Sequence, residues 1–499
     1  MPAATLRDAF DLWPEASLEA IHAAALELLE LAGVRVDSSL AREVLLGAGC
    51  RSGPQERLLI PAAVVQATLA ACPGAFVLVA RDEVRSLQVD PDPGPTFVHN
   101  MGAAAEVADP RSGAQRRATL RDQALAARVM HRLRHQHAIT PLLQPGDVPA
   151  QLEPFFSYLV LANESDKYLG GPGISSALQV QYLIRMSAAL TRPATADGRY
   201  PLDLAFSPVS PLVLGGSVSE ALVAAARSGQ VVCEILPCPA AATTAPAAIA
   251  AAVAQQHAEV LAGVVLAQAA APGTPIYYGP RLSAVDPRTG SVLSGTPETG
   301  VASMAATLLA RRCGLACDCY GPTSDSKVLD AQFGHEHGIN AMLGLVARPR
   351  FLSGIGDVQA GAASNLESLV IDDDVLASAF YAVTPRPWDA EALDVRAIAE
   401  GILSGRGFLG TKHTRRYIRS EFVSPVVSYR GRLGDWLRAG RAGVVDIAAE
   451  RVQELVAEPP VGLPADTLEA LCALIDTAAV EVGLTEWPDP REVLEAVSV

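Results

Sequence analysis

Residues 315–338, LACDCYGPTSDSKVLDAQFGHEHG, contain the pattern that decides the fold. Their first six residues form an apolar run typical of a short buried strand, and a Gly-Pro pair then ends it. Ser324 or Asp325 can cap a helix that follows. Gln332 and Glu336 stand four residues apart in that helix and would share one face. Alternating α/β proteins place their chemistry just after a strand, so the segment predicts one strand-helix unit of such a protein.

The same unit recurs along the chain. Seven strand-like runs lie within about 215 residues, each is followed by Gly, Pro or Ser, and Ala-rich helical segments separate them. Strands separated by helices form a parallel sheet, and seven or eight units of about 30 residues predict a (β/α)8 TIM barrel. A doubly wound open sheet is the alternative, but no Gly-rich dinucleotide fingerprint follows any run. The runs cover residues 138–140, 168–170, 204–206, 231–236, 276–278, 316–320 and 351–353.

Helical segments flank the barrel pattern. Two places could supply the eighth strand, residues 97–100 or a segment after Asp372. We expect an N-terminal helical extension over residues 1–75 and a C-terminal, mostly helical extension over residues 386–499. The catalytic TIM barrel then covers residues 76–385 and includes an initial β-rich segment.

The composition narrows the class of protein. The formal net charge of -15 at pH 7 argues against nucleic acid as a partner, because phosphate binding needs clustered Lys and Arg. The most apolar stretch, residues 240–271, is interrupted by Gln, His and Glu, so it predicts a buried helix and no membrane span. The charged N-terminus does not fit an export signal. We expect a cytoplasmic protein whose eight cysteines are reduced thiols.

Three cysteines raise the question of a metal site. Cys313, Cys317 and Cys319 form a C-x3-C-x-C pattern. Cys317 and Cys319 would alternate on one face of a buried strand, where small thiols pack well, and a second pair of zinc ligands is missing from the sequence pattern. His335 and His337 are two residues apart and would point in different directions on a helix. We therefore predict no metal site.

The loops after the strands are the expected place of the functional site. In a barrel these loops gather at one rim and would form a single pocket. They contain few pairs of a nucleophile and a base, which indicates that another molecule brings the reactive atom. The loops are residues 171–173, 207–208, 237–239, 279–280, 321–326 and 354–356.

Short motifs occur in order along most of the chain. They include IHAAALELLELAGV at residues 21–34, SPVSP at 207–211, SDSK at 324–327, DAQ at 330–332 and FLGTKHT at 408–414. In this order and coverage they resemble the trimethylamine methyltransferase family, the corrinoid-dependent MttB-like amine methyltransferases. Further matching positions are residues 163–167, 242–246, 268, 278–279, 286–290 and 295–298.

The resemblance implies a TIM barrel that moves a methyl group from a small methylated amine to the cobalt of a corrinoid, which a separate cognate protein carries. This chain then binds no cofactor tightly. Founding members of the family hold a pyrrolysine, and the similar position falls at Gly334, so the chain looks like a non-pyrrolysine relative that resembles glycine betaine:corrinoid methyltransferases. His335 stands where relatives commonly have Tyr. Large barrels with helical extensions often associate, so we also expect a homo-oligomer.

A quaternary amine suits such a site because its nitrogen already carries the charge that lets it leave as a neutral amine. Aromatic faces hold a permanent cation at roughly 0.5 to 2 kcal/mol per face, and a betaine carboxylate would need Arg or His. We expect Gln332, Gly334 and Glu336 to form the catalytic wall where the pyrrolysine is missing. The expected substrate-binding residues are Phe97, His99, Tyr278, Arg288, Tyr320, Phe333, His335 and His337.

Two other functions stay open at this point. One is a zinc-dependent barrel methyltransferase or lyase that uses Cys317, Cys319 and a histidine. The other is a non-catalytic homologue that only binds quaternary amines.

Overall fold

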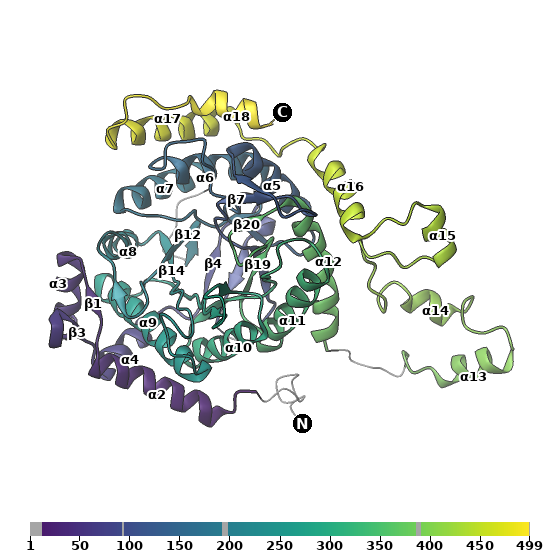
Figure 1. Cartoon of the computed structure of the whole chain (residues 1–499), viewed down its shortest axis with the longest axis horizontal. Coiled ribbons are helices and arrows are strands. Elements are labelled where there is room, and N and C mark those ends of the chain that lie inside the picture. The colour runs from purple at the N-terminus through teal and green to yellow at the C-terminus, as the bar shows by residue number, and fades with distance from the viewer. Residues whose placement is uncertain (1–11, 92–93, 192–197, 386–390, 499) are drawn as a thin grey trace.

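Eight parallel strands form a closed barrel. The barrel lies at the centre of the ring of helices (Figure 1). The computed structural model describes residues 12–91, 94–191, 198–385 and 391–498. Six strands pair in the order β12-β14-β15-β18-β19-β6, and β9 pairs with β10. Backbone bonds from His137 to Val98 (2.8 Å) and from Gly171 to Asp203 (3.0 Å) join these two groups into a ring. The strands are β6 (Phe97–Asn100), β9 (Ala138–Ile139), β10 (Tyr168–Leu169), β12 (Leu202–Phe206), β14 (Val231–Ile235), β15 (Ile276–Tyr278), β18 (Ala316–Tyr320) and β19 (Phe351–Ile355).

The barrel confirms the predicted fold class. All seven predicted runs are barrel strands, and the eighth is Phe97–Asn100, which pairs with β19 through Phe97 and Phe351. The alternative after Asp372 is wrong, because Asp372 lies inside a helix.

One helix follows each strand, and together they surround the barrel (Figure 1). The long apolar helix α9 has a length and composition that could cross a membrane, but 83% of its apolar 18-residue stretch is buried inside the molecule. That burial is typical of a core helix, as predicted. The surrounding helices are α5 (Leu120–Arg132), α6 (Glu153–Glu164), α7 (Ala177–Leu190), α8 (Gly216–Ser228), α9 (Ile249–Ala270), α10 (Pro297–Arg312), α11 (Ala331–Ala347) and α12 (Leu366–Val383).

The start of α11 differs from the prediction. Asp330 caps this helix by accepting a hydrogen bond from the Phe333 amide at 3.1 Å, so neither Ser324 nor Asp325 is the cap. The Asp325 carboxylate instead accepts hydrogen bonds from the amides of Ser294 (2.8 Å) and Gly295 (3.1 Å). Asp325 therefore joins the loop after β18 to the loop before α10, and the chain cannot enter the helix until residue 331.

The N-terminal helices lie against one side of the barrel, beside α8, α9 and α10 (Figure 1). They are α2 (Glu15–Leu31), α3 (Ser39–Gly47) and α4 (Ala62–Ala71), with the short strands β1 (Arg35–Val36), β2 (Arg51–Ser52) and β3 (Leu58–Leu59) between them. The next segment, β4 (Phe76–Leu78), forms an antiparallel hairpin with β5 (Leu87–Val89). The ring of Phe76 packs 5.3 Å from that of Tyr277 inside the barrel, so this hairpin closes one end of it.

The remaining short strands connect loops around the barrel. They are β7 (Glu106–Ala108), β8 (Gln115–Arg117), β11 (Arg199–Tyr200), β13 (Val213–Leu214), β16 (Ala284–Val285), β17 (Val292–Leu293) and β20 (Ala363–Ser364).

After α12 the chain runs along the outside of the barrel. The helices α13 (Val395–Leu403), α14 (Lys412–Tyr417) and α15 (Leu433–Arg438) project away from the barrel in Figure 1. The next helix, α16 (Val444–Val456), packs along α12, while α17 (Ala465–Glu481) and α18 (Pro490–Ser498) pack on α7 and α5. The division of the chain after residues 75 and 385 stays a prediction, and residues 386–390 at the second boundary lie outside the described part.

Candidate functional site

A cavity of about 400 Å³ lies inside the barrel at its carboxyl-terminal end, where such enzymes have their active sites. Strand alternation selects the side chains that reach it. On β18, Asp318 and Tyr320 line the cavity, whereas the Cys317 thiol points to the Thr307 hydroxyl of α10 at 3.6 Å. Cys319, two residues further along the strand, lies on the same outer face. A zinc-dependent reaction at these two thiols therefore has no support, because both face the surrounding helices.

A buried network of charges forms one wall of the cavity. The Arg281 guanidinium donates to Asp318 at 2.7 Å and to Glu234 at 3.2 Å, and His99 lies 2.9 Å from the same Asp318 oxygen. Burial alone would raise the pKa of Asp318, but the Arg281 guanidinium beside it and the hydrogen bond with His99 hold that pKa below its ordinary value. Burial and then the Asp318 charge raise the pKa of Glu234 well above its usual range. The network therefore keeps Asp318 ionised beside Arg281 and favours a protonated Glu234.

Asp203 is a further buried carboxylate in the lining of the cavity. Its carboxylate accepts a hydrogen bond from the Tyr168 hydroxyl at 2.5 Å, and this is its only side-chain hydrogen bond to the described residues. Burial raises the pKa of Asp203 to about 6. A carboxylate that is buried without a cation in hydrogen-bond contact favours a positively charged ligand.

Aromatic rings complete the lining. Tyr168, Tyr277, Tyr320 and Phe351 all face the cavity. Arg281 lies over the ring of Tyr320, 4.8 Å from its centroid, so that face already holds a cation. The rings of Tyr277 and Phe351 pack edge to face at 5.4 Å, and the buried Tyr277 hydroxyl has no hydrogen-bond partner among the described residues.

Of the predicted substrate-binding residues, only His99 and Tyr320 line this cavity. Tyr278 points outward, where its hydroxyl lies 2.9 Å from His257 Nδ1 of α9, and its neighbour Tyr277 faces inward instead. Arg288 is 87% exposed and pairs with Asp286 in the turn between β16 and β17. Phe97 lies at the other end of the barrel interior, with its ring 5.6 Å from that of Phe351.

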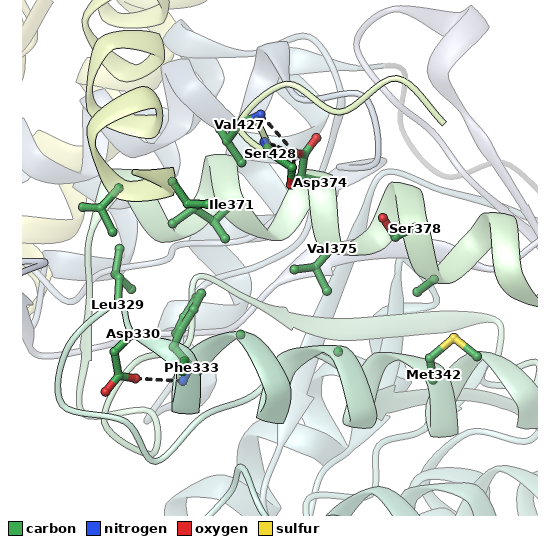
Figure 2. A pocket seen from close by; sticks show the side chains of 16 residues that line it. Leu329, Asp330, Phe333, Met342, Ile371, Asp374, Val375, Ser378, Val427 and Ser428 are labelled. Carbon is green, nitrogen blue, oxygen red and sulfur yellow. Dashed lines mark hydrogen bonds between the residues drawn. The ribbon is translucent and has the colours of Figure 1, made fainter. Parts of the chain in front are cut away.

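The predicted residues of α11 lie away from the barrel cavity. Phe333 and Gly334 line a second, apolar cavity of about 660 Å³ between α11, α12 and the chain around Val427 and Val444 (Figure 2). His335 is exposed, and its Nδ1 lies 2.9 Å from the Ala331 carbonyl.

Three further α11 residues belong to hydrogen-bond networks beneath the loops. The Glu336 carboxylate accepts from the Ser324 hydroxyl (2.7 Å), the Asp325 amide (2.8 Å) and the Gln332 amide group (2.8 Å). The shared face of Gln332 and Glu336 is thus confirmed. His337 is buried, 2.5 Å from an Asp372 oxygen and 3.0 Å from the Asp357 carbonyl. These contacts hold the loop after β18 and the loop after β19 in place.

The sequence did contain a pattern that points to the cavity carboxylates, which were not among the predicted site residues. Asp203, Glu234 and Asp318 are each a single carboxylate inside an otherwise apolar strand. In a barrel strand such a residue is tolerated only where it faces a cavity or a partner. Arg281 had no such signal, because it lies in a loop and reaches Glu234 and Asp318 only after folding.

The closed barrel and the polar cavity at its mouth are those of a TIM-barrel enzyme. The chain belongs to the trimethylamine methyltransferase (MTTB) family, whose sequence profile matches residues 4–483. It is 27% identical over 452 residues to trimethylamine methyltransferase MttB of Methanosarcina thermophila, which covers 89% of this chain and 92% of that protein. It is also 27% identical over 478 residues to glycine betaine methyltransferase of Desulfitobacterium hafniense, covering 95% of this chain and 98% of that one.

Among solved structures, the monomethylamine methyltransferase MtmB of Methanosarcina barkeri aligns with 97% of this chain and 96% of its own, at 11% identity and a TM-score of 0.48. The fold assignment rests on the eight paired strands themselves. As a member of this family, the protein is a methyltransferase.

Proposed function

We propose that this methyltransferase takes a methyl group from a quaternary amine of the betaine type and passes it to the cobalt of a corrinoid on a separate protein. Asp203 carries the proposal: a buried carboxylate with Tyr168 as its only side-chain donor among the described residues faces a cavity lined by aromatic rings. The carboxylate and the aromatic faces of such a cavity would stabilise the positive charge of a permanent cation. The name of the Desulfitobacterium relative, glycine betaine methyltransferase, agrees with this substrate class.

A betaine has a charged group at each end, and the cavity contains a group of opposite charge for each. The ammonium group would lie beside Asp203 and the rings of Tyr168 and Tyr277. The carboxylate would lie toward the Arg281 guanidinium, with His99 beside it as a hydrogen-bonding group. In this orientation the rings of Tyr168 and Tyr277 would surround the methyl groups and keep water from them.

The corrinoid supplies the nucleophile, a reduced cobalt that accepts the methyl group. The leaving amine becomes neutral as its methyl is lost, so no side chain of this chain needs to donate a proton to it. The protein's task is then to bind, to orient and to keep water out. This agrees with a cavity whose ionisable groups are mostly engaged with one another.

The partner, the location and the assembly are parts of the same proposal. A cognate corrinoid protein would dock at the carboxyl end of the barrel, where the strand-following loops Gly171 to Ile174 and Ser207 line the cavity. The net charge of -15 suits a cytoplasmic enzyme, and a homo-oligomer is the expected assembly. This chain itself would hold no tightly bound cofactor.

A direct assay tests the substrate class. The purified chain is mixed with its reduced cognate corrinoid protein and with single amines, and methyl-cobalt formation is followed by absorbance. We expect methyl transfer from betaines and none from trimethylamine. Transfer from trimethylamine with none from any quaternary amine would overturn the proposal.

Tyr277→Leu should weaken binding of the amine. The substitution removes one aromatic face from the cavity, which is worth about 0.5 to 2 kcal/mol for a cation, so KM should rise roughly 2- to 30-fold. Steady-state kinetics with the preferred betaine measure this. Tyr429→Leu, at a tyrosine 44% exposed on the C-terminal extension, is the matched control and should leave KM unchanged. An equal rise in both variants would contradict the role of Tyr277.

The catalytic roles of Gln332, Gly334 and Glu336 stay predictions, and Gly334→Trp tests them. Open space surrounds the position of a Gly334 side chain, so the variant should fold. Because Gly334 lines the outer cavity and not the barrel cavity, we expect its turnover to match that of the wild type. Lost turnover with an unchanged melting temperature would instead restore this position to the active site.

A further inference from the structure

Two histidines and a cysteine meet outside the barrel, where the N-terminal extension packs on it. His22 comes from α2, His257 from α9, and Cys313 directly follows α10. Their ligand atoms, one imidazole nitrogen from each histidine and the thiol sulfur, all lie within 4.8 Å of one another. We infer that this cluster is a zinc site that fastens α2 to the barrel, independent of the methyl-transfer cavity.

The spacing of the three atoms fits a tetrahedral ion after small adjustments. Zinc binds nitrogen at about 2.0 to 2.1 Å and sulfur at about 2.3 Å, so neighbouring ligand atoms stand about 3.3 to 3.7 Å apart. His22 Nδ1 and His257 Nε2 are now 2.8 Å apart, in hydrogen-bond contact. The two rings need to separate by about 0.5 Å to admit the ion. Side-chain rotation of the partly buried His22 would provide this separation.

Both imidazoles are in the protonation state that a metal needs. Burial lowers the pKa of His257 to about 3, and burial together with the Arg312 charge lowers that of His22. Each ring is therefore neutral at pH 7, and each can present a lone pair to an ion once the ion replaces the hydrogen bond between them and His22 carries its proton on the other nitrogen.

Tyr278 forms a hydrogen bond with His257 that orients this zinc ligand. Its hydroxyl lies 2.9 Å from His257 Nδ1. When that nitrogen carries the proton and donates it to the tyrosine oxygen, the lone pair of His257 Nε2 points toward His22. Metal-binding histidines commonly use their second nitrogen in this way. The inward-outward alternation of β15, which keeps Tyr278 out of the barrel cavity, places it here.

Binding of Zn²⁺ must remove the proton of the Cys313 thiol. Burial raises the pKa of Cys313 to about 12, so the thiol is protonated without a metal. The balanced step is Cys313-SH plus Zn²⁺ giving Cys313-S-Zn⁺ plus H⁺, and the zinc-sulfur bond replaces the sulfur-hydrogen bond. The nearby Arg312 opposes the ion, but it is paired with Glu15. His22 and Cys313 are only partly buried, so water can reach the fourth position.

The choice of zinc follows from the ligand types. One thiolate with two imidazoles favours zinc over magnesium or calcium, which prefer oxygen ligands. Because the three ligands come from α2, α9 and α10, the ion would resist separation of the N-terminal extension from the barrel.

The full-length chain, stripped with a chelator and kept reduced, is titrated with Zn²⁺ and separately with Co²⁺. We expect one zinc per chain, a rise in Tm on adding zinc, and a thiolate-to-cobalt charge-transfer band with Co²⁺. Cys313→Ser and His22→Gln should each weaken zinc binding at least tenfold, and Cys313→Ser should also lose the cobalt band. Tyr278→Phe should weaken zinc binding about 10- to 100-fold.

Cys238→Ser is the control, because the exposed Cys238 thiol is a site that stray zinc would choose. This variant should bind zinc as the wild type does. The inference is overturned when the wild type binds no stoichiometric zinc, or when Cys313→Ser binds it equally well. In both cases the His22 to His257 contact is a structural hydrogen bond and not part of a metal site. If Cys313→Ser does not fold, the Tyr278→Phe and His22→Gln variants are titrated with Co²⁺ instead. A cobalt band that forms only at higher Co²⁺ concentration supports the site, and a band that forms as in the wild type overturns it.

Discussion

Arg281→Met is expected to lower the free energy of unfolding by about 3 to 5 kcal/mol. Arg281 is 6% exposed and bonds both Asp318 and Glu234, so the variant leaves a buried carboxylate without its strongest cation. Breaking a buried ion pair costs more than the pair itself contributes, because the remaining charge cannot be hydrated. Equilibrium unfolding in urea, with the slope checked for constancy, measures the change.

Arg288→Met is the matched control for this prediction. Arg288 is the arginine that the sequence suggested for the site, but it is 87% exposed and its pair with Asp286 lies in solvent. Surface pairs contribute about 0 to 1 kcal/mol, so the control should lose less than about 1 kcal/mol. Similar losses in the two variants would contradict the charge network as a structural element of the barrel.

Asp203→Asn is expected to reduce kcat/KM for the preferred quaternary amine roughly 30- to 4,000-fold. Removing one partner of a buried charge pair costs about 2 to 5 kcal/mol, and each 1.4 kcal/mol is tenfold. The asparagine oxygen can still accept the hydrogen bond from Tyr168, so the barrel should keep its stability. Kinetics of methyl-cobalt formation give the rate, and thermal unfolding checks the fold. A rate within about twofold of the wild type would remove Asp203 from substrate binding.

The same carboxylate predicts a pH dependence. Because burial raises the pKa of Asp203 to about 6, the group is protonated below that pH and cannot hold a cation. kcat/KM should therefore rise as the pH increases through 6. The free energy of unfolding changes in the opposite direction, because the folded chain binds the Asp203 proton more tightly than the unfolded chain does. The stabilisation from protonated Asp203 is fully present below the ordinary pKa of an aspartate and is lost as the pH rises through about 6. Asp203→Asn should remove both effects.

The architecture of the chain could be predicted because it repeats. Short apolar runs separated by helical segments occur at the barrel strands, and seven of the eight were recognisable by this rhythm. Such a pattern is local: a strand buried on both sides must be apolar, and a helix that covers it must be amphipathic or buried. The family, too, is recognisable from ordered motifs, and its profile covers residues 4–483.

The residues of the site were predicted less well. They come from different strands, and a residue lines the cavity only when its side chain points into the barrel. Tyr277 and Tyr278 are adjacent and chemically identical, yet one faces the cavity and the other faces His257 of α9. The reactive segment at residues 315–338 supplied Asp318 and Tyr320 to the cavity, whereas its helical half forms hydrogen bonds beneath the loops and lines an outer groove.

The sequence alone determined a (β/α)8 barrel and its methyltransferase family, since both are encoded in periodicity and in ordered motifs. Only the tertiary structure decided which residues meet. Closing the barrel brings Asp203, Glu234, Asp318 and Arg281 to one cavity, and packing α2 on the barrel brings His22 to His257 and Cys313. These distances depend on strand register and helix packing, which no local pattern specifies.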